Sequence, residues 1–145
     1  MELQIGSVSP ILAFVDSLGN SLSLLGKKTV LYFYPKDNTP GCTAQACNLN
    51  ENLDFLHTKG FQVIGVSTDS DKSHEKFKSK YQLQFPLVSD ESQEIVNAFG
   101  VWVEKSMYGK SYMGIARTTF VIDEKGIITD IITKVDTKNH TEQIH

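Results

Sequence analysis

The chain has 145 residues, of which 40% are hydrophobic and 21% charged, with a net charge of -3. This length can bury one substantial core and is too short for two ordinary domains, so we expect residues 1–145 to form a single domain. An acidic balance without a basic stripe argues against nucleic acid or an anionic membrane as a partner. No basic segment precedes an apolar one at the amino terminus, and the longest apolar runs have strand length, which predicts a cytoplasmic protein.

The first elements predicted along the chain are a β-hairpin, a strand and a helix. Residues 11–18 and 22–25 flank a Gly19-Asn20 turn and read as a leading hairpin. Residues 29–34 are continuously apolar, as expected for a strand buried on both faces, and this strand ends at Pro35. After a Pro40-Gly41 turn, apolar residues recur at helical spacing as far as Gly60, which predicts one helix.

The remainder alternates strands and helices. We expect a strand over 61–67, a helix over 69–81, a short strand over 85–88 and a brief helix from a capping box at 90–93 to Gly100. Residues 101–114 have no clear periodicity and are interpreted as a loop, with Trp102, Tyr108 and Tyr112 as packing aromatics or as one wall of a pocket. A hairpin over 118–122 and 127–133 follows, and barely one turn of a final helix begins near Asn139. This order predicts an α/β fold.

Cys42 falls in the first turn of the helix that follows the buried strand. Backbone N–H groups there lack intrahelical partners, and the helix dipole adds positive charge, so a thiolate is favoured at this place. The Thr39 hydroxyl, three residues upstream, is close enough to donate a hydrogen bond to the sulfur or to a substrate oxygen. Pro35 and Pro40 offer no N–H and would make one wall of the pocket apolar and stiff. Cys42 is therefore a candidate nucleophile.

These residues resemble a known family. Pro35-x-x-x-Thr39-x-x-Cys42 matches the signature of the peroxiredoxins, and the continuation to Cys47 is similar to the bacterioferritin-comigratory, or PrxQ, branch. Three later blocks resemble the same branch, so that the similarity runs from about residue 6 to residue 135: Phe99-Gly-Val-Trp102, Tyr108-Gly-Lys-Ser-Tyr112 and Arg117-Thr-Thr-Phe-Val-Ile-Asp123.

The resemblance implies a thioredoxin-like three-layer fold with an additional N-terminal β-hairpin. It implies a thiol peroxidase that reduces hydrogen peroxide and organic hydroperoxides without a metal or organic cofactor. Cys42 would be the peroxidatic cysteine and Cys47 the resolving cysteine, while Thr39 and Pro35 shape the pocket and Arg117 is the cation beside the sulfur. Thioredoxin or a similar dithiol donor would recycle the enzyme. We expect a monomer, with a dimer as the alternative.

Helix geometry places a condition on pairing of the two cysteines. Residues five apart on an ideal helix have Cα atoms roughly 8.7 Å apart. A disulfide requires about 7 Å or less. If Cys42 and Cys47 pair, the first one or two turns of the helix must unwind, so we predict a helix that is folded when reduced and locally unfolded when oxidised.

Other interpretations remain open at this point. Cys47 is close enough to the apolar stripe of the helix to be a packing residue, and Arg117 could form an ordinary surface ion pair. A zinc site is disfavoured because two cysteines are too few ligands, and the four histidines are scattered and expected to be solvated. A general thiol-disulfide oxidoreductase would favour a Cys-x-x-Cys pair, which this chain lacks. A redox-sensing binding module, read by a partner when its helix unwinds, is the non-enzymatic alternative.

Two departures from the family pattern concern the later part of the chain. Val103 stands where glycine is expected, which puts the conformation of residues 101–114 in question. The final helix is also shorter than in relatives, so that more of the sheet is exposed or a partner covers it.

Overall fold

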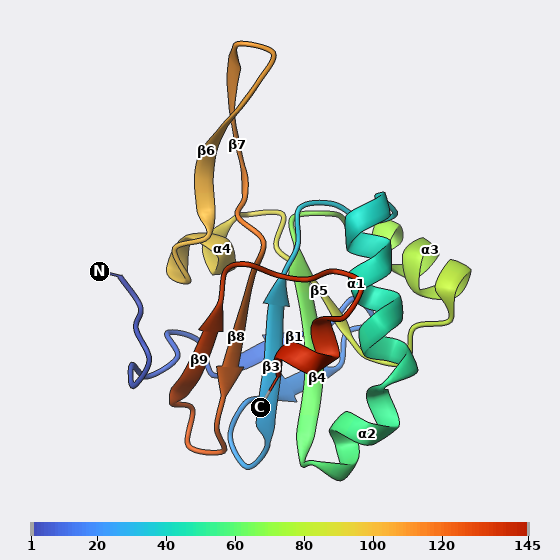
Figure 1. The fold of residues 1–145 in the computed structure, drawn as a ribbon, viewed down its shortest axis with the longest axis vertical. Helices are drawn as coiled ribbons and strands as arrows, with labels where there is room; N and C mark the ends of the chain where they lie inside the picture. Colours follow the sequence, from blue (N-terminus) through green and yellow to red (C-terminus); the bar gives the residue numbers. More distant parts are fainter. Residues whose placement is uncertain (1, 145) are drawn as a thin grey trace.

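A five-stranded mixed sheet is the centre of the computed structural model, which describes residues 2–144. Its strands lie in the order β5-β4-β3-β8-β9 (Figure 1). The three parallel strands are β3 (Lys28–Phe33), β4 (Phe61–Ser67) and β5 (Leu87–Ser89). Strands β8 (Thr118–Ile122) and β9 (Ile128–Ile132) continue the sheet in antiparallel fashion. None of the helices in the described range is long and apolar enough to cross a membrane.

Helices cover one face of the sheet, and the leading hairpin and α4 (Glu94–Ala98) cover the other. Both faces must be covered because successive apolar side chains along β3 point to opposite faces. Val30, Tyr32 and Tyr34 join one buried cluster with side chains of α1 (Pro40–Glu51), α2 (Leu53–Thr58) and α3 (Asp71–Tyr81). Leu31 and Phe33 join a second cluster on the other face. That cluster includes side chains of the hairpin β1 (Ala13–Val15) and β2 (Ser21–Ser23) and of α4 (Glu94–Ala98). The α/β fold and the leading hairpin are confirmed.

The helix after β3 begins as predicted but is interrupted. Thr39 is its N-cap residue with extended backbone, Pro40 occupies the first turn, and Cys42 therefore lies in that turn. The predicted single helix to Gly60 is wrong in detail, because Asn52 leaves helical geometry and separates α1 from α2. Leu49 on one side of the break and Leu53 on the other are both buried, so the apolar stripe continues across it.

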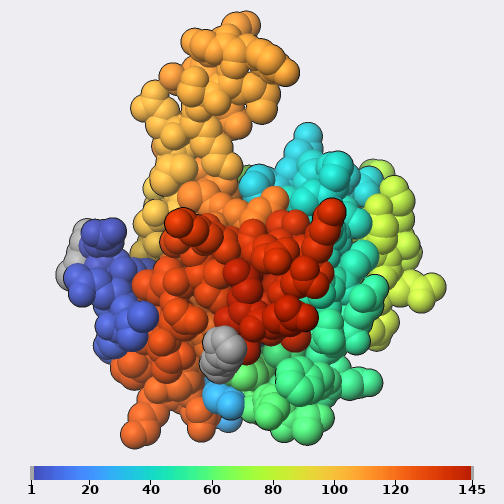
Figure 2. All heavy atoms as spheres, in the orientation of Figure 1, coloured from blue at the N-terminus to red at the C-terminus, as the bar shows by residue number. Residues whose placement is uncertain are grey.

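The predicted loop over residues 101–114 is instead a β-hairpin. Strands β6 (Trp102–Met107) and β7 (Lys110–Ile115) pair in antiparallel register and project away from the body (Figures 1 and 2). The turn residues Tyr108 and Gly109 have φ values of +52° and +77°, as in a two-residue hairpin turn of type I′. Val103 lies opposite Gly114, so the hairpin accommodates the side chain that replaces the expected glycine.

The expectation of solvated histidines is wrong for two of them. His74 on α3 and His140 at the start of the 3-10 helix η1 (His140–Gln143) are fully buried. His57 is exposed as expected, and His145 lies outside the described residues. The short final helix is confirmed as a single turn. His140 contacts Thr119 of β8 through a hydrogen bond of 2.8 Å, which anchors η1 against the sheet.

Candidate active site

The register of the sheet brings Cys42 and Arg117 together from distant parts of the chain. Thr118, the first residue of β8, pairs with Phe33 at the end of β3, so Arg117 lies beside the loop that leads into α1. Arg117 Nη2 donates a hydrogen bond to Cys42 Sγ at 3.2 Å. The cysteine is 1% exposed and Arg117 is half-buried, so this contact is partly shielded from solvent. The predicted pair of cysteine and cation is present in the structure.

A third residue holds the guanidinium in place. Gln45, one turn after Cys42 on α1, is fully buried and its Oε1 accepts a hydrogen bond from Arg117 Nη1 at 2.7 Å. A guanidinium only donates, which fixes the amide oxygen toward Arg117. Sequence reasoning missed Gln45; its spacing of three residues from Cys42, on the same helix face, was the available signal.

Gly41 permits the close approach of the arginine. A Cβ atom at this position would lie 3.2 Å from Arg117 Nη2, closer than ordinary van der Waals contact. The guanidinium thus occupies space that any other side chain at position 41 would take. Because Pro40 has no N–H, the first-turn N–H groups without intrahelical partners are those of Gly41 and Cys42.

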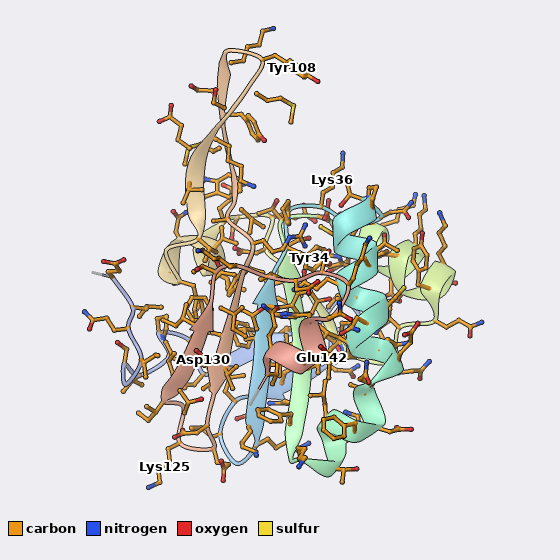
Figure 3. The ribbon with its side chains drawn as sticks, in the orientation of Figure 1. Tyr34, Lys36, Tyr108, Lys125, Asp130 and Glu142 are labelled. Atoms are coloured by element: carbon orange, nitrogen blue, oxygen red, sulfur yellow. The ribbon has the colours of Figure 1, made fainter. Side chains whose placement is uncertain are left out.

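Thr39 and Pro35 lie in the loop before α1, but neither contacts the sulfur through a hydrogen bond. The Thr39 hydroxyl donates to Lys36 O at 2.9 Å and so closes the loop on itself. Pro35 is half-buried directly after the buried strand. Figure 3 labels Lys36 at the end of the molecule from which the β6–β7 hairpin projects. The Thr39 hydroxyl would have to rotate to reach a ligand at Cys42.

Cys47 differs from Cys42 in its surroundings. It is half-buried, and both cysteines are free thiols within one continuous helix. Burial raises the pKa of the Cys47 thiol, and the negative charge of Glu51, one turn further along, raises it more. Both effects disfavour the Cys47 thiolate in this conformation.

A buried polar cluster holds the loop before α1. Asp37 is 6% exposed and accepts hydrogen bonds from Tyr34 Oη at 2.6 Å and from Ser73 Oγ at 2.8 Å. Its Oδ2 also lies 2.7 Å from His74 Nδ1. Ligand atoms of Asp37, Asp69 and His74 lie within 4.8 Å of one another, close enough for a cation. Hydrogen bonds within the protein already occupy these atoms, so the cluster is explained without a metal.

The charges of Cys42 and Arg117 also affect the pKa values of two further side chains. Burial raises the pKa of Tyr32 well above 10, and the negative charge of Cys42 raises it further. The Tyr32 hydroxyl has no hydrogen-bond partner among the described residues. Burial lowers the pKa of Lys105 on β6, and so does the charge of Arg117, whereas Cys42 raises it. The hairpin thus contributes a second cation to the surroundings of the site.

Comparison with known proteins identifies the family. Residues 17–131 match the AhpC/TSA family. The chain is 44% identical to a putative peroxiredoxin Bcp of Coxiella burnetii over 99% of this chain and 97% of the relative. The chain belongs to the peroxiredoxins. Its thiol-peroxidase class follows from that membership, as the resemblance of the sequence had indicated.

Solved peroxiredoxins confirm the thioredoxin-like fold and the branch. A PrxQ mutant from Xylella fastidiosa superposes with a TM-score of 0.90 at 34% identity, covering 99% of this chain and 93% of that one. The bacterioferritin comigratory protein of Xanthomonas campestris, studied for alkyl peroxide reduction, superposes with a TM-score of 0.86 at 37% identity and covers 97% and 92% of the two chains. This peroxiredoxin therefore belongs to the Bcp/PrxQ branch.

Proposed function

We propose that this peroxiredoxin reduces hydrogen peroxide and organic hydroperoxides at Cys42 and resolves the product through a Cys42–Cys47 disulfide. The observation that carries the proposal is the 3.2 Å contact between Arg117 Nη2 and the buried Cys42 sulfur in the first turn of α1. A cation and free N–H groups there favour the thiolate, which is the reactive form of cysteine.

In the first step, the Cys42 thiolate attacks the terminal oxygen of the hydroperoxide. The S–O bond forms as the O–O bond breaks, and the departing alkoxide or hydroxide takes a proton to leave as alcohol or water. Both peroxide oxygens gain negative charge in the transition state. Arg117 and the first-turn N–H groups of Gly41 and Cys42 are the donors placed to stabilise that charge, and Gln45 keeps the guanidinium aimed at the sulfur.

In the second step, the Cys47 sulfur attacks the Cys42 sulfenic acid and water leaves, which gives the disulfide. Burial and Glu51 keep the pKa of Cys47 raised while α1 is folded. Unwinding would expose the thiol and move it away from Glu51, which removes both causes. The motion that allows the sulfurs to meet therefore also activates the second sulfur as a nucleophile.

The third step returns the enzyme to its dithiol form. We propose thioredoxin or a similar dithiol as the reductant, which attacks the disulfide by thiol–disulfide exchange. The substrate proposal for organic hydroperoxides draws support from the Xanthomonas relative studied for alkyl peroxide reduction. We also propose that the protein acts as a cytoplasmic monomer.

The test is intact mass after one equivalent of hydrogen peroxide, with peroxide consumption followed in parallel. Wild type should lose two hydrogens, Cys47→Ser should gain one oxygen, and Cys42→Ser should neither change nor consume peroxide. Peroxide consumption by Cys42→Ser would refute the central role of Cys42. Repeated turnover with a dithiol donor distinguishes an enzyme from a sensor, because a sensor needs to react only once.

A further inference from the structure

We propose that Asp37 and Asn48 are positioning residues that confine unwinding of α1 to the segment between them. This inference rests on the proposed Cys42–Cys47 disulfide and adds the limits of the motion. Both cysteines lie between the two residues, and Cys47 directly precedes Asn48. Each of the two anchors is tied by its side chain to an element outside α1.

The upstream anchor is Asp37 with the residues that bind it. Its carboxylate accepts hydrogen bonds from Tyr34 and Ser73, and its backbone N–H donates to Asp69 Oδ2 at 2.8 Å. These partners belong to the end of β3, to α3 and to the connection between β4 and α3. The loop before Thr39 is thus fixed to three parts of the body.

His74 adds a buried hydrogen bond to this anchor. Its Nε2 lies 3.0 Å from Val88 O, and a carbonyl oxygen only accepts, so Nε2 carries a proton. Its Nδ1 lies 2.7 Å from Asp37 Oδ2. The imidazole and the carboxyl group are both buried, and separating them would leave buried polar atoms without partners. The anchor therefore resists the motion of the neighbouring helix.

The downstream anchor is Asn48, which binds the carboxy-terminal segment. Its Nδ2 donates to Lys138 O at 3.0 Å, and its Oδ1 accepts from both the backbone N–H and the hydroxyl of Thr141 at 2.8 Å. Thr141 belongs to η1, which His140 ties to the sheet. Asn48 therefore stops the unwinding of α1 immediately after Cys47.

The stretch between the anchors has few features that stabilise a helix. No side chain caps its N-terminus, and its first turn contains no acidic residue. Gly41 has low helix propensity. Arg117 ties this stretch to the sheet through hydrogen bonds to Cys42 and Gln45, in addition to the core packing of Cys42 and Ala46, and disulfide formation removes the first of these hydrogen bonds. A weak helix start between two firm anchors is what a confined, reversible unwinding requires.

Hydrogen-exchange mass spectrometry on the reduced and oxidised protein tests the proposal. In wild type, oxidation should accelerate exchange more than tenfold within residues 43–51, whose N–H groups donate to carbonyl groups of residues 39–47, and less than twofold in residues 52–58. Asn48→Ala should extend the accelerated region to residues 52–55 in the oxidised form alone. Asn50→Ala is the matched control: Asn50 makes two comparable hydrogen bonds, to Gln82 and Gln84, but lies beyond the anchor and should leave the boundary unchanged.

Two further variants complete the test. Asn48→Asp keeps the acceptor for Thr141 and should restore part of the boundary, which also covers the case in which Asn48→Ala does not fold. Asp37→Asn removes one of the two carboxyl oxygens that bind Tyr34, Ser73 and His74 and should extend accelerated exchange to residues 36–37 after oxidation. If exchange in oxidised wild type spreads past residue 51 although intact mass shows the disulfide, the anchors are refuted and the proposed function stands. If no disulfide forms, the proposed function itself fails.

Discussion

Arg117 is the residue whose replacement should slow the reaction with peroxide most sharply after Cys42 itself. Arg117→Met keeps an extended side chain but removes the donor 3.2 Å from the sulfur. A charge-assisted hydrogen bond contributes about 1.5–3 kcal/mol, and loss of one preorganised donor at a developing negative charge typically costs ~10²–10³ in rate. We expect a fall of that size in the second-order rate constant for hydrogen peroxide.

Two other substitutions test the second contact of the guanidinium, and each should lower the rate constant by less than Arg117→Met does. Arg117→Lys retains a charge but loses the fork that also reaches Gln45, so we expect a fall of roughly tenfold. Gln45→Leu leaves the sulfur contact in place and removes only its support, and we expect a fall of about the same size. Leaving buried Gln45 Oε1 unpaired in Arg117→Met also costs about 1–3 kcal/mol of unfolding free energy, which urea titration would measure.

The assay is rapid quench of the reduced enzyme with one equivalent of peroxide, followed by thiol blocking and intact mass. It reads the first chemical step separately from recycling. A rate for Arg117→Met within threefold of wild type would refute the role assigned to the guanidinium. Circular dichroism of the three variants checks that α1 is still folded.

Three further predictions follow from individual sites. Gly41→Ala should slow peroxide consumption measured by rapid quench, because its Cβ would lie 3.2 Å from Arg117 Nη2 and displace the guanidinium from Cys42. Gly65→Ala should lower the unfolding free energy by about 1–3 kcal/mol, since its Cβ would lie 2.9 Å from the Tyr32 ring and hydroxyl, and a melting temperature equal to wild type would contradict this. Burial lowers the pKa of His140, so the unfolded state binds a proton at this side chain more readily than the folded state does. The contribution of His140 to stability should therefore be complete above about pH 6.5 and decline below it. Between pH 7 and 5, His140→Gln should lose less unfolding free energy than wild type.

The sequence was sufficient to predict the position of the candidate nucleophile and most of the sheet. Strand β3 is a continuous apolar run, and Pro40 and Gly41 mark the helix start, so Cys42 could be placed in a first turn from local rules alone. The contact with Arg117 depends on the pairing of β3 with β8, which is not local. Only the resemblance to the peroxiredoxins indicated it in advance.

The features that were missed depend on tertiary packing. Apart from its base, where Ile115 and Trp102 join the core, the β6–β7 hairpin is exposed, so its strands lack the alternation of apolar and polar residues that would have predicted them. His74 and His140 are buried because Asp37, Val88 and Thr119 supply hydrogen bonds from other elements, and no pattern near either histidine in the sequence reports those partners. The periodicity of apolar residues along the sequence does not predict buried polar clusters of this kind.

The spacing of the two cysteines imposes opposite demands on α1, and the proposed cycle satisfies them in sequence. While the helix is folded, Cys42 contacts Arg117, and the raised pKa of Cys47 keeps that thiol from competing for peroxide. In the proposed cycle, unwinding would activate Cys47 and, by the same movement, withdraw the Cys42 sulfenic acid from the donors that assist peroxide attack. Resolution is thus promoted at the moment when overoxidation is disfavoured.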